Sequence, residues 1–327
     1  MRPFSYLRAE DTASALASLS AHPDAAYIAG GTTLLDLMKD QVAQPALLVD
    51  ITRLPLRGIE VCEDGVLIGA LTTMSEVAEH ALIRQRYPLV VEALLASASQ
   101  QLRNMATLGG NLLQRTRCSY FRDPVFACNK RVPGSGCAAL TGENRTHAIL
   151  GTSSHCIATH GSDLAVALVA LDAHVLLEGP AGQRRLALRD LYLLPGTTPE
   201  REHVLAPAEL IVAIELPTAF NASRSAYLKV RDRASYEFAL VSAAAALELE
   251  GTTIRAARLA LGGVGTIPWR ARSAERILQG APLSREVFAA AAEAALEGAQ
   301  PQRDNAFKIE LARRTVVRVL SEVGGVA

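Results

Sequence analysis

The sequence has no excess of charge of either sign and few aromatic residues. Its 33 lysines and arginines are balanced by 33 aspartates and glutamates, and Phe, Trp and Tyr together make up only 5% of the residues. A nucleic-acid-binding protein usually carries a basic excess on one face, and it stacks unpaired bases on aromatic side chains. We therefore expect no nucleic-acid partner.

Long apolar runs are also missing. No stretch of 18 or more consecutive apolar residues occurs, so we expect no membrane span. Charges are scattered through the N-terminal residues and no continuous apolar segment follows, which predicts that the chain has no secretory signal of its own. The chain would then be periplasmic if it is exported with a partner that carries a signal, and cytoplasmic otherwise.

Cysteine is scarce, with five residues in 327, which is too few for a disulfide framework. Four of the five nevertheless lie within 39 residues: Cys118, Cys128, Cys137 and Cys156. The C-x-x-C pairs of zinc knuckles are absent. An iron–sulfur cube is wider than one ion and accepts thiolates from separated loops, so the spacing favours a cluster. Structural or incidental cysteines on a basic loop are the alternative.

The residues around these cysteines are basic. Six cations between Arg115 and Arg145 face only Asp123 and Glu143. Because a thiolate-ligated cluster is negatively charged, nearby cations would stabilise its reduced state. Three histidines also occur here, and since four thiolates suffice for a cluster, we expect them to be hydrogen-bonding loop residues: His147, His155 and His160.

Two glycine turns suit a phosphate group. The first spans Ala29 to Leu34 (AGGTTL) and the second spans Thr107 to Asn111 (TLGGN). Glycine lets a phosphate approach backbone N–H groups that a Cβ atom would shield, and threonine adds a hydroxyl donor. For either loop alone, an ordinary tight turn is the alternative interpretation. Neither loop matches the G-x-G-x-x-G pattern of Rossmann domains. As a pair, they suit the two phosphates of a dinucleotide.

Apolar patterning predicts an α+β protein. Residues 1–55 read as a small α/β unit with parallel strands, and residues 56–218 as a second unit with a long helical stretch at 74–97, broken near Pro88. Residues 101–163 lack periodicity. Residues 219–327 read as a third unit with strands at 227–230, 243–249 and 254–261, followed by three helices.

These segments resemble the FAD-binding subunits of the xanthine dehydrogenase and molybdenum hydroxylase group over essentially the whole chain. The two glycine loops carry the resemblance, together with Ser162-Asp163-Leu164-Ala165 and Tyr227-Leu228-Lys229-Val230-Arg231. The cysteine segment, about residues 114–160, is most similar to the FAD subunit of bacterial periplasmic aldehyde oxidoreductase, which carries an extra 4Fe-4S cluster. 4-Hydroxybenzoyl-CoA reductase has a comparable insertion, so the cluster alone does not specify the substrate.

The resemblance implies a PCMH-type FAD-binding fold of two α/β subdomains plus a C-terminal α+β domain. It implies that the two loops hold the FAD diphosphate through Ala29, Gly30, Gly31, Thr32, Thr33, Leu34, Thr107, Gly109, Gly110 and Asn111. It places Asp163 near the FAD sugar, and Ile211 and Lys229 near the adenine or flavin end. The four loop cysteines would ligate the cluster. In members of the group that lack the cysteine segment, the second glycine loop is followed almost directly by the Ser-Asp pair. In this sequence some fifty residues lie between Asn111 and Ser162.

The implied function is electron transfer without catalytic residues for substrate chemistry. A molybdenum-binding large subunit would oxidise the substrate, a small subunit with 2Fe-2S clusters would relay the electrons, and this chain would pass them from FAD to an external acceptor. The FAD subunit of a xanthine dehydrogenase-like or hydroxybenzoyl-CoA reductase-like enzyme is an alternative. Two rivals of other classes are a free-standing flavin oxidase and a zinc-stabilised nucleotide-binding module.

Overall fold

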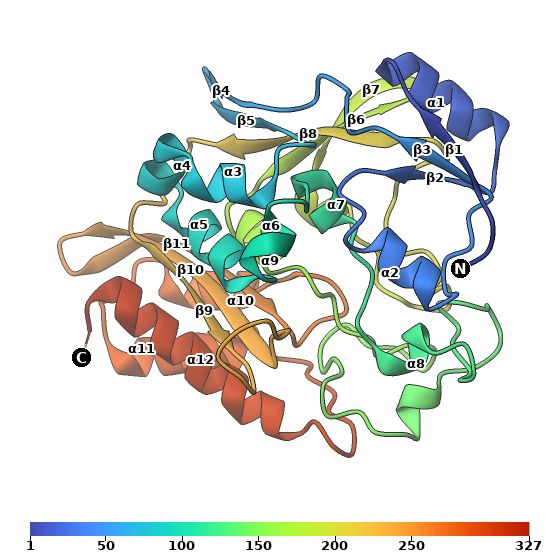
Figure 1. Ribbon diagram of the computed structural model, residues 1–327. Coiled ribbons are helices and arrows are strands. Elements are labelled where there is room, and N and C mark those ends of the chain that lie inside the picture. The colour runs from blue at the N-terminus through green and yellow to red at the C-terminus, as the bar shows by residue number, and fades with distance from the viewer. Residues whose placement is uncertain (327) are drawn as a thin grey trace.

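The computed structural model describes residues 1–326 and arranges them around three β-sheets (Figure 1). The N-terminal sheet is parallel, in the order β1-β3-β2. Its strands are β1 (Ser5–Arg8), β2 (Ala25–Ile28) and β3 (Leu47–Asp50). Helix α1 (Thr12–Ala21) begins with a capping box on Asp11. The expected parallel pairing is confirmed.

Asp50 ties the N-terminal strand β1 to the rest of this unit. It is 5% exposed, and it accepts hydrogen bonds from the Tyr6 hydroxyl, from Arg8 at 3.2 Å and from the backbone N–H of Thr52 at 2.8 Å. Burial alone would raise the pKa of Asp50, but these hydrogen bonds outweigh it and lower the pKa to about 2. The carboxylate therefore remains ionised at the end of β3.

The second sheet has five antiparallel strands in the order β4-β5-β8-β6-β7. They are β4 (Ile59–Cys62), β5 (Gly65–Gly69), β6 (His174–Gly179), β7 (Gly182–Ala187) and β8 (Leu210–Pro217). A short 3-10 helix, η2 (Leu188–Asp190), follows β7. All five strands lie within residues 56–218, the range of the second unit expected from the sequence.

Helices cover one face of this sheet. The predicted helical stretch is divided into α3 (Met74–Glu79), α4 (Ala81–Arg86) and α5 (Pro88–Ala96). The break at Pro88 is confirmed, and Pro88 is the first residue of α5, where a missing N–H costs nothing. A further break at His80 was not predicted. Helix α9 (Asp163–Ala170) lies beside α5, and all eight of its residues are buried.

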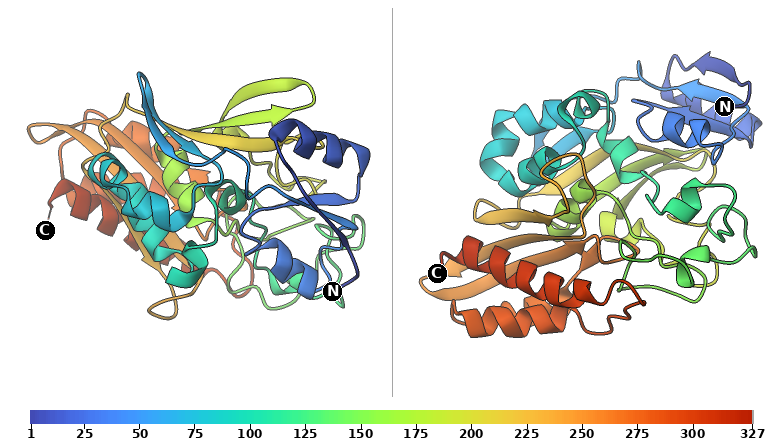
Figure 2. Two further views of the ribbon diagram at one scale, coloured as in Figure 1. Left: turned by 45° about the horizontal axis from the view of Figure 1, so that its top comes forward. Right: turned by 60° about the horizontal axis from the view of Figure 1, so that its bottom comes forward.

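The third sheet is antiparallel, in the order β12-β11-β10-β9, and it lies between two helical layers (Figure 2). Its strands are β9 (Ser225–Val230), β10 (Val241–Glu250), β11 (Thr253–Gly262) and β12 (Trp269–Arg270). Helices α10 (Arg272–Leu278), α11 (Arg285–Ala295) and α12 (Phe307–Gly324) cover one face. Helices α5 and α9 cover the other face.

Both faces of strand β10 are buried, and its side chains enter two different cores in alternation. Ala244 and Ala246 enter the core that includes α5 and α9, whereas Ala243 and Ala245 enter the core of the C-terminal helices. Successive side chains of a strand point to opposite faces, so a run of small apolar residues packs against both layers.

The segment between α5 and α9 contains only short helices. They are α6 (Gln100–Arg103), α7 (Leu108–Leu112), α8 (Ser119–Arg122) and the 3-10 helix η1 (Ala138–Leu140). The cysteine loop, residues 114–160, lies near α2 (Figure 1), and its Leu150 forms an isolated bridge with Gly265, just after β11. Within residues 1–326, no helix combines the length and the apolar character that a bilayer span requires.

Candidate cofactor site

The first glycine loop joins β2 to helix α2 (Leu34–Lys39). Within the described chain, no hydrogen bond to another protein group uses the backbone N–H groups of Gly30, Gly31, Thr32 or Thr33. The Thr33 side chain makes no capping bond either. These four residues are partly exposed, so their N–H groups are accessible to a ligand. Consecutive free N–H groups are therefore a fitting cradle for an anion.

Gly30 is a position where no side chain fits. A Cβ atom there would lie 1.9 Å from the carbonyl oxygen of Met105 and 2.6 Å from its carbonyl carbon. The neighbouring Gly31 has φ +71°, a left-handed backbone conformation that residues other than glycine rarely adopt. The pair of glycines thus allows the first loop to rest directly on the segment that leads into the second loop.

The second loop forms the start of α7, and it is fixed to the start of α9. The Thr107 hydroxyl accepts from the backbone N–H of Gly110 at 3.3 Å. The Ser162 hydroxyl donates to the Asn111 side-chain oxygen at 2.6 Å and also accepts from the N–H of Ala165 at 2.9 Å. The long insertion therefore leaves the second loop and the Ser162-Asp163 pair next to each other.

Two cavities meet at these loops. One has a volume of about 250 Å³ and the other about 260 Å³, and Thr32, Thr33 and Gly110 line both. All thirteen residues for which a cofactor contact was predicted line one cavity or the other. The first cavity holds Ile211 and the apolar side chains of Leu71 and Leu210, and the second holds the more polar residues described next. The contacts themselves remain predictions.

A buried ion pair forms one wall of the second cavity. Asp163 is 7% exposed and accepts from Lys229 Nζ at 2.8 Å, from Ser97 Oγ at 2.9 Å and from the Tyr227 hydroxyl at 2.7 Å. Lys229 Nζ also donates to the carbonyl oxygen of Ala96 at 3.1 Å. Burial and the adjacent carboxylate raise the pKa of Tyr227 well above its usual value, so this side chain remains a donor.

Several residues that line the second cavity were not predicted from the sequence. They are Gln114, Arg117, Arg233, Tyr236 and Phe238. The Arg117 guanidinium lies over the Phe238 ring, 5.1 Å from its centroid, and donates to Asp36 of α2 at 2.8 Å. No local motif marks these positions, because they come from segments more than a hundred residues apart in the chain.

None of the four loop cysteines forms a disulfide, and pairs of their thiols are close enough to affect each other's pKa. Cys128 and Cys137 form an isolated antiparallel bridge. Burial raises the pKa of Cys118 to about 12, and the thiol groups of Cys128 and Cys156 raise it as well. Burial likewise raises the pKa of Cys156, with further increases from Cys137 and Cys128. Cys62, by contrast, is exposed on β4.

Backbone donors surround these thiols. The N–H groups of Tyr120 and Phe121 lower the pKa of Cys118, although burial, which raises it, has the larger effect. The N–H of Ala158 donates to Cys156 Sγ at 3.5 Å. Among residues 1–326, no three His, Cys, Asp or Glu side chains are close enough together to hold a single metal ion.

The cysteine loop is anchored on α2, the helix that follows the first glycine loop. Leu37 of α2 packs with Phe121 and Cys128 in a small buried cluster. Arg122 donates to Asp36 at 2.6 Å and to Asp40 at 3.3 Å. The loop that carries the cysteines thus supports the helix whose first residues border the cofactor cavities.

The three histidines of the loop make hydrogen-bond contacts. His147 Nε2 lies 3.1 Å from Cys118 Sγ, and His155 Nδ1 lies 3.1 Å from the Ser154 hydroxyl. His160 Nδ1 accepts from the N–H of Ser162 at 3.3 Å. Burial, together with the charge of Lys308, lowers the pKa of His147 to about 4, so its ring is neutral at physiological pH.

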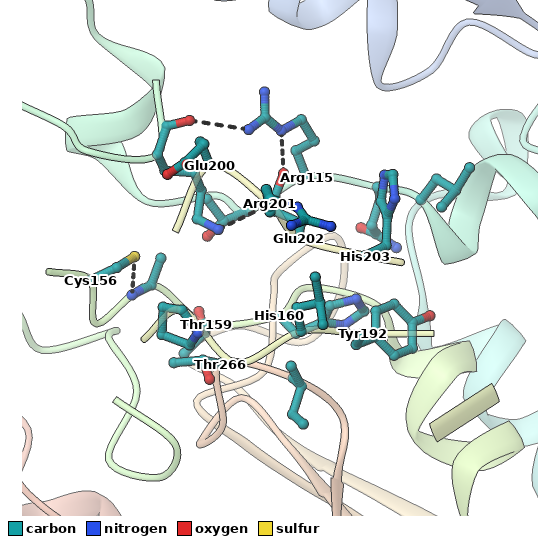
Figure 3. Close-up of a pocket in the computed structure, with 18 of the residues that line it drawn as sticks. Arg115, Cys156, Thr159, His160, Tyr192, Glu200, Arg201, Glu202, His203 and Thr266 are labelled. Atoms are coloured by element: carbon teal, nitrogen blue, oxygen red, sulfur yellow. Dashed lines mark hydrogen bonds and ion pairs between the residues drawn. The ribbon is translucent and has the colours of Figure 1, made fainter. Parts of the chain in front are cut away.

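A third cavity, of about 410 Å³, borders the cysteine loop. Figure 3 shows Cys156 at one end, with Arg115 and Glu202 across the cavity from His160. Arg115 and Lys130 both pair with Glu202, the latter at 3.0 Å, and they hold its pKa below the usual range against the effect of burial. Arg115 also lines the first cofactor cavity, so it stands in the wall between that cavity and the cysteine loop.

Comparisons with known proteins agree with this arrangement. The family model described as the FAD binding domain in molybdopterin dehydrogenase matches residues 2–219, and the CO dehydrogenase flavoprotein C-terminal domain matches residues 226–323. The FAD-binding subunit of Escherichia coli aldehyde oxidoreductase is 48% identical over 98% of both chains. The glyceraldehyde dehydrogenase medium chain of Sulfolobus acidocaldarius is 29% identical over 97% of this chain and 95% of its own.

Solved structures show the same fold. The carbon monoxide dehydrogenase of Hydrogenophaga pseudoflava superposes with a TM-score of 0.78 at 27% identity, covering 100% of this chain and 99% of the other. The expected FAD-binding fold with a C-terminal α+β domain is therefore confirmed. The free N–H groups and the glycine clearance of the first loop fit the diphosphate of FAD, and the two adjoining cavities extend from that point in two directions.

Proposed function

Because the chain belongs to the family of FAD-binding domains of molybdopterin dehydrogenases, we propose that it is the FAD-containing electron-transfer subunit of a molybdenum-dependent aldehyde oxidoreductase. The observation that carries this proposal is the 48% identity to the E. coli aldehyde oxidoreductase subunit over 98% of both chains. The FAD-binding subunit of xanthine dehydrogenase is only 27% identical, which makes a xanthine-oxidising complex the weaker candidate.

FAD would supply the redox chemistry, since flavin accepts electrons singly and releases them in pairs. The residues of this chain would bind and orient it. The N–H groups of Gly30 to Thr33 would donate to the diphosphate, and Asp163, held by Lys229 and Tyr227, would face the sugar. The partners would be a molybdenum-binding large subunit, which oxidises the aldehyde, and a small subunit with 2Fe-2S clusters, in a heterotrimer.

A 4Fe-4S cluster on Cys118, Cys128, Cys137 and Cys156 completes the proposal. Three features of the loop support it. Each thiol interacts with at least two of the others, two of them are buried, and backbone N–H groups point at the sulfur atoms of Cys118 and Cys156. A buried thiolate without compensation is unfavourable, and bound iron supplies that compensation. A four-iron cube also needs more widely separated ligands than a single ion does.

The compartment would follow from the partners. We propose export to the periplasm together with a signal-bearing partner, because the chain resembles the periplasmic aldehyde oxidoreductase subunit. Fractionation of cells that express all three subunits, with and without the signal segment of the partner, tests this point. Recovery of the chain from the periplasm in both cases would contradict it.

The cofactor assignment is tested by anaerobic purification of the chain, followed by analysis of FAD, iron, sulfide and zinc. Reductive titration should take up more electrons than the flavin accounts for, and low-temperature EPR should show a reduced cluster. Cys128→Ser should abolish the EPR signal, whereas Cys62→Ser is the matched control, because Cys62 is exposed and outside the loop.

The outcomes separate the alternatives. Flavin without iron would retain the FAD assignment and refute the cluster. A colourless protein that contains zinc would support the zinc-stabilised nucleotide-binding module instead. Oxidation of an aldehyde by the isolated chain would support a free-standing flavin oxidase.

A further inference from the structure

His147 is in direct contact with one of the four loop thiols. Its Nε2 atom lies 3.1 Å from Cys118 Sγ, which is within hydrogen-bonding distance of a sulfur atom. The His147 side chain is 3% exposed, so water does not compete for this contact. The other ring nitrogen, Nδ1, is buried and has no hydrogen-bond partner within residues 1–326.

This environment determines which nitrogen carries the proton. Among buried backbone groups, an N–H without an acceptor is rarer than a carbonyl oxygen with an unused lone pair, and we apply the same preference to the buried Nδ1. The proton of the neutral ring therefore belongs on Nε2, and Nδ1 carries only its lone pair. Nε2–H then donates to Cys118, and the sulfur acts as the acceptor. A thiolate ligated to iron is such an acceptor.

The C-terminal domain fixes the position of His147. Asn305 Nδ2 donates to the carbonyl oxygen of His147 at 3.2 Å, and Lys308 Nζ donates to the same oxygen at 3.0 Å. Lys308 Nζ also donates to the carbonyl oxygens of Thr146 at 2.9 Å and Gly263 at 2.8 Å. Asn305 and Lys308 are both fully buried. The backbone that carries the imidazole is thus held from α12 and from the segment that precedes it.

We propose that His147 is a positioning residue that donates a hydrogen bond from Nε2 to Cys118 Sγ and thereby raises the reduction potential of the cluster. The proposal rests on the proposed 4Fe-4S cluster. Reduction adds one electron to the cluster, and part of that charge resides on the cysteine sulfurs. A donor aimed at such a sulfur stabilises the reduced form more than the oxidised form. No proton or bond is exchanged in the step.

The test is an EPR-monitored redox titration of the purified full chain, in which no partner cluster overlaps the signal. His147→Leu removes the donor, and His147→Gln supplies an amide N–H in its place. His155→Leu is the matched control, because His155 belongs to the same loop and its ring contacts Ser154 rather than a cysteine. Iron and sulfide analysis establishes that each variant retains its cluster.

We expect His147→Leu to lower the midpoint potential by an amount equivalent to at least a tenfold change in the reduction equilibrium, which is about 59 mV for one electron. His147→Gln should recover much of that shift, and His155→Leu should leave the potential unchanged. An intact cluster with a wild-type potential in His147→Leu would overturn the proposal. A wild-type chain without any cluster signal would instead refute the proposed function from which the inference starts.

If His147→Leu assembles no cluster, the wild-type chain decides the matter. In a chain labelled with ¹⁵N-histidine, pulsed EPR of the reduced cluster should detect a weak ¹⁵N coupling that disappears in His147→Gln. Within residues 1–326, His147 is the histidine whose ring nitrogen contacts a cysteine sulfur. The absence of any ¹⁵N coupling in the wild-type chain would show that no histidine N–H is bonded to the cluster.

Discussion

Gly30 is the residue whose substitution should separate the cofactor loops most directly. In Gly30→Ala, the new Cβ would lie 1.9 Å from the Met105 carbonyl oxygen, whereas Cβ atoms in proteins essentially never come within 3.0 Å of such an atom. The first loop would therefore have to move by about 1 Å relative to the segment that leads into the second loop. Overpacking of this kind costs about 1–3 kcal/mol.

If that cost falls on the cofactor-bound state, the affinity for FAD decreases about five- to 150-fold. Equilibrium dialysis with free FAD, or the fluorescence of released flavin, measures this change. Gly179→Ala in β6 is the matched control, because its Cβ would lie no closer than 3.2 Å to Glu209 Cγ and 3.7 Å to the nearest backbone atom, the Glu209 Cα. Wild-type FAD affinity and wild-type thermal stability in Gly30→Ala would refute the proposed packing of the two loops.

Three further predictions concern ion pairs. Lys229→Met should leave the Asp163 carboxylate buried without its cation and destabilise the fold by about 3–5 kcal/mol in urea unfolding, with partial recovery when Asp163→Asn is added. If adding Asp163→Asn restored no stability, the loss in Lys229→Met would not come from the broken Lys229–Asp163 ion pair. Because folding lowers the pKa of Asp50 from 3.8 to about 2, its carboxylate stabilises the fold above pH 4. Asp50→Asn should therefore cost about 2 kcal/mol at pH 7, and the difference from wild type should vanish as the pH falls towards 2; a difference independent of pH would contradict this. Arg122→Met removes the bond to Asp36, so limited proteolysis should cleave the cysteine loop faster, and an unchanged cleavage rate would show that the loop does not depend on α2.

The strands that the sequence predicts are those with apolar side chains on at least one face. β10 was predicted, at residues 243–249, because its burial imposes a long apolar run. β1 and β7 were missed because most of their residues are exposed, and they carry no hydrophobic alternation. The break at His80 was missed for a related reason, since no proline or glycine marks it.

The candidate site was predictable where glycine constrains the backbone. The clash at Gly30 and the left-handed φ of Gly31 explain why that loop has a recognisable pattern. The contact between Asp163 and Lys229 joins residues 66 positions apart, and the contact between Arg117 and Asp36 joins residues 81 positions apart. Such pairs depend on how the three sheets pack together, and no local pattern encodes them.

The most direct test of the electron-transfer function is the reduction of the flavin by an aldehyde in the absence of oxygen. In stopped-flow experiments on the complex with the proposed molybdenum and 2Fe-2S subunits, an aldehyde should bleach the flavin absorption of this chain. The isolated chain, loaded with FAD and mixed with the same aldehyde, should not bleach, because the proposed function assigns substrate oxidation to the molybdenum-binding partner. Rapid bleaching of the isolated chain, or an oxidised flavin in a complex that has consumed aldehyde, would contradict the proposed role.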